Sequence, residues 1–286
     1  SNYSKLTLEY HGIHEFRGAE RVQQAPHEAD IAEQTDHDIN GGGLKYDLFS
    51  KDYKHRFGAY ASAQHTKRES YYGAGKDPNA YGSTTDMTAI VGSQYSYSFD
   101  RCLFMPAELT TGLEYNFDNL HDLMLGHDRE VKQTTHIESV FLQNEWKNKQ
   151  WSFLLGGRLD KHNMVDHVIF SPRANLRYNP TENMNLRASY SFGFRAPQAF
   201  DEDLHIENVG GTVSMIELAK DLTEEKSQSL SISGDLYHRW GDFQGNLLIE
   251  GFILRFQTYL PYVRKESVTV LLSMNGITRK ELRYMV

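Results

Sequence analysis

Cysteine and long apolar runs are the two scarcest features of this sequence. Its 286 residues include one cysteine, Cys102, which excludes an internal disulfide framework and a thiolate zinc cluster. The longest uncharged stretch that we find, Met87–Phe99, contains Gly, Ser, Gln and Thr. A membrane-spanning helix needs about 20 apolar residues, so a helical membrane protein is excluded. A membrane β-barrel is not excluded, because its alternating strands leave a mean hydropathy typical of soluble proteins.

Signals for catalysis, nucleic-acid binding and export are also missing. No Ser/His/Asp or Cys/His arrangement carries a recognisable motif, and the scattered carboxylates define no glycosidase pair, so we expect no enzyme. The glycines at 41–43 precede a strand pattern rather than a helix, which excludes a phosphate loop. The net charge of −8 argues against a nucleic-acid partner. Because no basic start precedes an apolar stretch at Ser1, we expect a cytosolic protein or a piece of a longer precursor.

The dominant pattern is an alternation of apolar and polar residues with period 2, which predicts β-strands. It is clearest in Glu108–Phe117, Trp151–Asp160 and Asn185–Phe194. Similar runs lie near residues 3–11, 36–48, 54–68, 85–98, 133–146, 168–178, 225–239 and 242–256. We therefore predict about eleven strands, several of them about ten residues or longer, which is the length that crosses a membrane.

The expected connections alternate between long and short. The long ones are 12–35, 69–84, 117–132 and 194–224, with a shorter member at 161–167. The short ones lie near 49–53, 99–105, 147–150, 179–183 and 240–241. Aromatic residues gather near the strand ends, as in the interfacial girdles of a barrel. The pattern predicts an all-β fold, an antiparallel transmembrane β-barrel portion with long extracellular loops and short periplasmic turns.

Several segments carry a resemblance to a known family. In Ser189–Gln198 an aromatic strand ends in Phe-Arg-Ala-Pro, and the acidic stretch Phe200–His205 follows. This resembles a box of TonB-dependent outer-membrane receptors, in which it leads into a long extracellular loop. Asp221–Ser227 resembles the start of the family's next strand, and Pro26–Ala32 and Ser70–Gly73 resemble receptors from Bacteroides-type bacteria.

The resemblance implies an outer-membrane location in a Gram-negative bacterium and contact with outer-membrane lipid. The family's barrels have about 22 strands and a plugged lumen, so residues 1–255 would form about half a barrel without the plug. Residues 256–286 are expected to be an uncertain C-terminal segment, truncated or non-native. The implied function is uptake of a metal chelate (a siderophore or haem) or cobalamin, with TonB and the plug domain as partners in the intact receptor.

Two sets of candidate site residues follow. The resemblance places Arg195, Asp201, Glu202, Asp203 and His205 at the ligand mouth, against the alternative of an ordinary acidic surface loop. We expect no resident cofactor other than calcium in the extracellular loops. The carboxylate-rich segment after 117 suits calcium but lacks the EF-hand register; its candidate ligands are Asp118, His121, Asp122 and Asp128.

The first expected loop is rich in acids and histidines. His11, His14, His27 and His37 lie among Asp36, Asp38 and other acids, and such ligands could hold a cation. No spacing matches a known metal motif, so a solvated loop is the favoured interpretation. Residues 12–38 hold seven acids and two bases, which favours a neutral or cationic ligand such as cobalamin or haem over a tri-anionic siderophore.

Two other functions stay open at this point. One is a passive, plugless porin-like barrel, which would conduct without a ligand. The other is a soluble all-β protein that binds or cleaves carbohydrate, with short strands in two packed sheets. The sorting of connections by length favours the membrane receptor over the soluble protein.

Overall fold

The fold is a single large antiparallel sheet. The computed structural model describes residues 3–18, 25–124, 126, 128–199, 207–209, 212–214, 223–241, 243–257, 266–274 and 280–285. The strands of the large sheet are β1 (Ser4–Gly18), β2 (Ile31–Phe49), β3 (His55–Ala74), β4 (Tyr81–Cys102), β5 (Met105–Met124), β6 (Arg129–Lys147), β7 (Trp151–His162), β8 (Ile169–Thr181), β9 (Met184–Arg195), β12 (Glu225–Trp240), β13 (Phe243–Gln257), β14 (Glu266–Met274) and β15 (Lys280–Met285). A short 3-10 helix, η1 (Pro26–Glu28), precedes β2, and β10 (Glu207–Val209) pairs with β11 (Thr212–Ser214).

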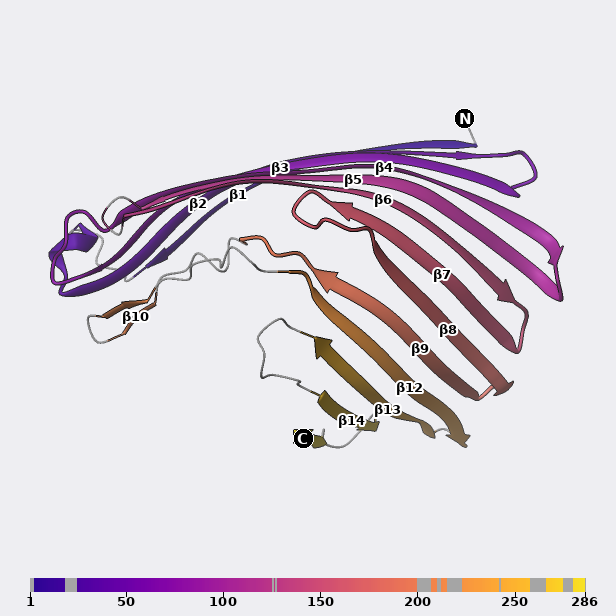
Figure 1. Cartoon of the computed structure of the whole chain (residues 1–286). Coiled ribbons are helices and arrows are strands. Elements are labelled where there is room, and N and C mark those ends of the chain that lie inside the picture. The colour runs from indigo at the N-terminus through magenta and orange to yellow at the C-terminus, as the bar shows by residue number, and fades with distance from the viewer. Residues whose placement is uncertain are drawn as a thin grey trace.

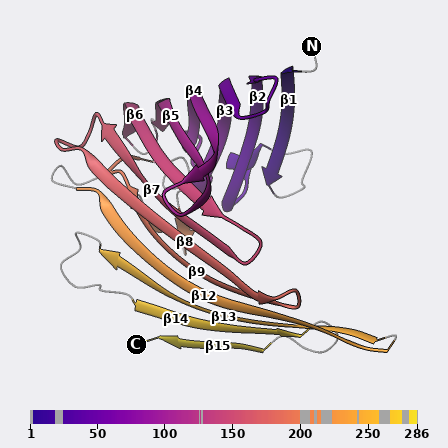
Figure 2. The ribbon, with the colours of Figure 1, turned by 90° about the vertical axis from the view of Figure 1, so that its right-hand side faces the viewer.

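Each strand of the large sheet pairs with the next one along the chain, and the order runs without a crossover from β1 to β15. The sheet curves strongly and stays open, with β1 and β15 at its two ends (Figures 1 and 2). Eleven of its strands lie before residue 258, which confirms the predicted strands and the all-β, antiparallel class. Among the described residues, no helix has the length and apolarity to cross a membrane.

The strands are longer than the sequence pattern predicts. β4 has 22 residues and β5 has 20, so each is about 65 Å or more in length at the usual rise per residue. The expected loops at 12–35, 69–84 and 117–132 are therefore wrong in extent, because most of each is strand. The expected sorting of connections holds only in part. The connections at 103–104 and 182–183 are tight and the one between β9 and β12 is long, but the connection at 125–128, expected to be long, has four residues and the one at 50–54, expected to be short, has five.

The two faces of the sheet differ as the alternation predicts. On β5, Leu113 and Tyr115 lie exposed on the outer face, and Glu114 and Asn116 point to the inner face. Large exposed side chains continue this apolar outer face on the neighbouring strands; they include Leu6, Leu8, Leu44, Tyr46, Val91, Val140, Leu142, Leu155, Leu159, Phe170, Ile232 and Ile249. Such a band, apolar outside and polar inside, is what a lipid-facing barrel wall requires.

The inner face is mainly polar, and hydrogen bonds and ion pairs link its side chains across the strands. Arg158 on β7 donates to Glu114 at 2.7 Å and to Asp160 at 2.6 Å. Tyr60 on β3 donates to the other oxygen of Glu114 at 2.5 Å. β14 and β15 extend the sheet within residues 256–286, and the division of the chain at about residue 255 stays a prediction.

Candidate functional site

A groove of about 570 Å³ lies on the inner face of β1 to β6. Two rows of residues in strand register form its floor. The first row is Glu9, Gly43, Ser62, Ile90, Asn116 and Ile137, and the second is His11, Gly41, Gln64, Thr88, Asp118 and Thr135. Adjacent strands lie about 4.8 Å apart, so the floor is wide enough to accept a ligand that bridges several strands.

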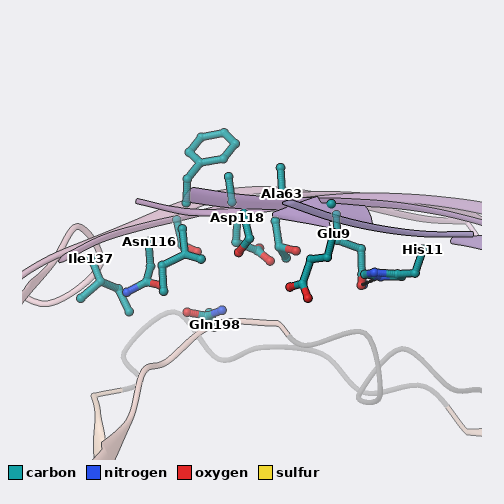
Figure 3. A pocket seen from close by; sticks show the side chains of 15 residues that line it. Glu9, His11, Ala63, Asn116, Asp118, Ile137 and Gln198 are labelled. Carbon is teal, nitrogen blue, oxygen red and sulfur yellow. Dashed lines mark hydrogen bonds between the residues drawn. The ribbon is translucent and has the colours of Figure 1, made fainter. Parts of the chain in front are cut away.

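Glycines of β2 make room at one end of this floor. A Cβ on Gly41 would lie 2.6 Å from Nε2 of His11, and a Cβ on Gly43 would lie 3.2 Å from Oε1 of Glu9. Side chains on β2 would therefore displace the imidazole and the carboxylate. The glycine run explains why both groups of β1 can lie over β2 and face the groove (Figure 3).

Gln198 and Ala199, which follow the Phe-Arg-Ala-Pro box and are called the cover below, lie over the inner face at the groove. Gln198 lies opposite the floor residues, with Asn116, Asp118 and Glu9 pointing toward it (Figure 3). Further along this connection, β10 lies against β3 (Figure 1). The described start of the connection between β9 and β12 therefore folds inward over the groove.

Side chains of β6 and β7 fix this cover. The amide of Gln133 donates to the Ala199 carbonyl at 3.1 Å and accepts from the Ala199 N–H at 2.9 Å. Ala199 also packs on Leu120, and both are buried. His162 is fully buried; its Nδ1 accepts from the Met164 N–H, so its Nε2 donates to Oε1 of Gln198 at 2.9 Å.

Glu224, just before the start of β12, is buried and marks the other end of the connection between β9 and β12. Its Oε1 lies 2.9 Å from Nε2 of His167 and 3.0 Å from Nζ of Lys226. Burial opposes ionisation of Glu224, but the hydrogen bond from Lys226, backbone hydrogen bonding and the nearby His167 outweigh it and hold the pKa of this carboxyl below its usual value. This ion pair is a second anchor of that connection.

The charged groups that line the groove are acidic. Glu9, Asp118 and the imidazole of His11 contribute to the lining, and no lysine or arginine does so among the described residues. A concave surface that carries two carboxylates attracts cationic or neutral ligands and repels anions. The groove therefore suits a polar ligand without a large negative charge.

The structure separates the residues predicted to hold calcium. The side chain of Asp118 lines the inner groove, whereas His121 points to the outer face and pairs with Glu130 at 3.2 Å. Asp122 is buried on the inner face, where Arg129 lies 2.8 Å and Thr84 2.6 Å from its carboxylate. Asp128 lies in the exposed turn before β6, with φ of 49°. The four do not converge on one point, and a calcium ion in these loops stays a prediction.

The residues predicted at the ligand mouth are only partly described. Arg195 is the last residue of β9, is exposed, and lies opposite Glu225 in register. Asp201, Glu202, Asp203 and His205 lie outside the described residues. Sequence reasoning missed Gln133 and His162, which hold the cover. No local motif marks them, because each acts on a segment far away in the sequence.

Comparisons with known proteins agree on one family. Residues 7–262 match the sequence model of the family described as TonB dependent receptor-like, β-barrel. A search of curated proteins finds no match. Similar solved structures include the alcaligin outer-membrane receptor FauA of Bordetella pertussis, with 13% identity and a TM-score of 0.64 over 100% of this chain and 50% of that one.

Two further structures are similar over nearly the whole chain. The ferric enterobactin receptor PfeA of Pseudomonas aeruginosa has 14% identity and a TM-score of 0.67, with coverage of 100% of this chain and 49% of that one. The hemophore receptor HasR of Serratia marcescens, solved with its hemophore and heme, has 13% identity and a TM-score of 0.69, with coverage of 99% and 52%. The chain spans about half the length of the structures that it matches.

Proposed function

The chain belongs to the TonB-dependent receptor-like β-barrel family, and from this premise we propose that it is the ligand-capturing half-barrel of an uptake receptor. It is a portion of a β-barrel wall of the Gram-negative outer membrane. The cargo of the intact receptor is a metal chelate, a siderophore or haem, with cobalamin as the alternative. The observation that carries this proposal is the polar inner groove covered by the segment that follows the Phe-Arg-Ala-Pro box.

The groove supports binding rather than covalent chemistry. Its described lining offers amides, hydroxyls, two carboxylates and one imidazole spread over five or more strands. Groups placed in this way can contact a large polar ligand at several points, which is the usual source of specificity in a binding site. The absence of basic groups from this lining favours a neutral or cationic chelate over a tri-anionic one.

The partners of the intact receptor belong to the same proposal. TonB would supply the energy for transport through a plug domain, and the inner face of this chain would contact the plug. The resemblance of Pro26–Ala32 and Ser70–Gly73 to Bacteroides-type receptors supports an origin in that group. The porin-like and the soluble carbohydrate alternatives are not favoured, because the family and the similar structures are those of transport receptors.

Uptake by cells tests the proposal. Cells that produce the intact receptor are compared with cells that lack it for energy-dependent accumulation of a ferric siderophore, haem and cobalamin. A double variant, Glu9→Gln with Asp118→Asn, is expected to weaken binding of the transported ligand while the receptor remains in the outer membrane. A receptor that accumulates none of the three, and that conducts ions without a ligand in planar bilayers, would contradict the proposal and support a plugless pore.

A further inference from the structure

On the outer face of the sheet, charged residues follow the apolar band toward the rim that carries the long connections. The last row in register that is mainly apolar is Tyr10, Gly42, Ala63, Ala89, Phe117 and His136. Four residues further along the strands, about 13 Å at the usual rise, a row consists of His14, Asp38, Lys67, Thr85, His121 and Lys132. This row lies on the long-loop side, so its side chains meet water or headgroups rather than lipid chains.

Three of the side chains on this face converge. Nδ1 of His14 lies 3.1 Å from Oδ1 of Asp38 and 3.4 Å from Oδ1 of Asp36, and one ligand atom from each residue falls within 4.8 Å of the others. His14 is directly opposite Asp38 in register, and Asp36 is the next residue on the same face of β2. Ligand atoms around a tetrahedral zinc ion lie about 3.3 Å apart, given bonds of about 2.0–2.1 Å. The two distances from His14, 3.1 and 3.4 Å, are close to this value.

Within the described part of the chain, neither carboxylate forms a direct ion pair with a lysine or an arginine. Among the described residues, the ion pairs of Asp36 and Asp38 are with His14 alone. Lys67 is next to Asp38 in register; its Nζ pairs with Glu69 at 2.9 Å, and its charge acts on Asp36 and Asp38 only from a longer distance. The second histidine of the row differs, because the partner of His121, Glu130, is also bound by Lys132 at 2.6 Å.

We propose that His14, Asp36 and Asp38 form a binding site for a divalent transition-metal ion, such as Zn²⁺, on the outer wall of the barrel. One imidazole nitrogen and two carboxylate oxygens suit a borderline cation better than calcium or magnesium, which prefer a full set of oxygens. The fourth position of a tetrahedral ion is open to solvent. Two paired strands hold the ligands in register, and β2 is paired on both sides, so the backbone positions of the site are fixed.

Zinc binding to the full chain in detergent micelles, measured by isothermal titration calorimetry, tests the site. Absorption of bound Co²⁺ in the visible range reports the coordination geometry independently. We expect one Zn²⁺ for each chain, and we expect His14→Ala and Asp38→Asn each to weaken binding about tenfold or more. His121→Ala is the matched control, because it removes an exposed histidine of the same row and should leave the affinity unchanged.

Each outcome decides the proposal. Loss of binding in the two site variants, with retention in His121→Ala and unchanged β-structure by circular dichroism, supports it. Equal weakening by His14→Ala and His121→Ala would show nonspecific binding to surface histidines and overturn it. Absence of stoichiometric zinc binding to the unmodified chain would overturn it as well. The uptake experiment does not depend on this result, since the site lies on the opposite face from the groove.

Discussion

Gln133 and Ala199, 66 residues apart in the sequence, exchange two hydrogen bonds across the inner face of the sheet. The side-chain amide of Gln133 satisfies both the N–H and the carbonyl of Ala199, as a neighbouring strand would. This single side chain therefore holds the start of the long connection over the groove. Side chains of β6 and β7 fix the start of the connection between β9 and β12, and Glu224 pairs with His167 at its end.

Gln133→Ala is expected to loosen the cover. Loss of two hydrogen bonds, about 0.5–1.5 kcal/mol each, should speed hydrogen exchange of the Ala199 amide by about tenfold. Gln143→Ala, on the inner face of the same strand but away from the cover, is the control. Equal protection of Ala199 in both variants, measured by hydrogen-exchange mass spectrometry, would contradict the role of Gln133.

Asp122→Asn is expected to destabilise the long-loop end of the sheet. Asp122 is buried between Arg68 and Arg129, and removing a charged partner from a buried pair costs about 3–5 kcal/mol. Urea unfolding in detergent should show this loss in the free energy of unfolding. The exposed pair of His121 with Glu130 offers a control, because Glu130→Gln should change the free energy of unfolding by about 0.5 kcal/mol or less. A similar effect of the two substitutions would argue against a structural ion pair at Asp122.

Glu224 should make stability depend on pH in the acid range. The pKa of its carboxyl is held below the usual 4.5, so the stabilisation is fully present above the unfolded-state value. It is lost as the pH falls through the lower, folded-state pKa. Glu224→Gln should therefore lower the melting temperature at neutral pH and flatten its decline below about pH 4.5, whereas Glu182→Gln in an exposed turn should not. A decline that is just as steep in Glu224→Gln would refute the assignment.

Leu113→Arg should prevent assembly into the membrane. Leu113 is 60% exposed in the middle of the apolar outer band, and an arginine at the bilayer midplane costs about 2–4 kcal/mol. Asn119→Arg places the same charge on the outer face of β5, above the band. Heat-modifiable mobility in electrophoresis, which reports a folded barrel, should be lost for the first variant and kept for the second. Normal assembly of Leu113→Arg would mean that this face does not meet lipid.

The sequence predicts the faces of the strands well where one face meets lipid. In Glu108–Phe117 strict alternation assigns Leu113 outward and Glu114 inward, and the structure confirms both. Beyond Phe117 polar and apolar residues occur on both faces of β5, with Asp122 and the buried Leu120 on the inner face, and the period-2 pattern disappears. Residues such as Asn119 and Asp122 then resemble a loop, although β5 continues to Met124.

The cluster of His14, Asp36 and Asp38 depends on the register between two strands. The local sequence pattern does not specify which residues of one strand lie opposite those of the next. His14, Asp36 and Asp38 occur in a recognisably acidic segment, but only the pairing of β1 with β2 brings them onto one face. The groove likewise combines Glu9 with Asn116 and Gln198 from distant parts of the chain. Asp118 and His121 lie close in sequence and look like a cluster, yet an odd separation along a strand places them on opposite faces.

Fluorescence quenching at paired positions of β5 tests the membrane-wall assignment most directly. In the intact receptor, with Cys102→Ser as background, a fluorophore is attached through Leu113→Cys or Asn116→Cys and the protein is placed in lipid bilayers. A quencher carried on lipid chains should quench the label at 113, and a water-soluble quencher should quench the label at 116. Quenching of both labels by the aqueous agent alone would show that the outer face does not meet lipid and would contradict the barrel-wall assignment.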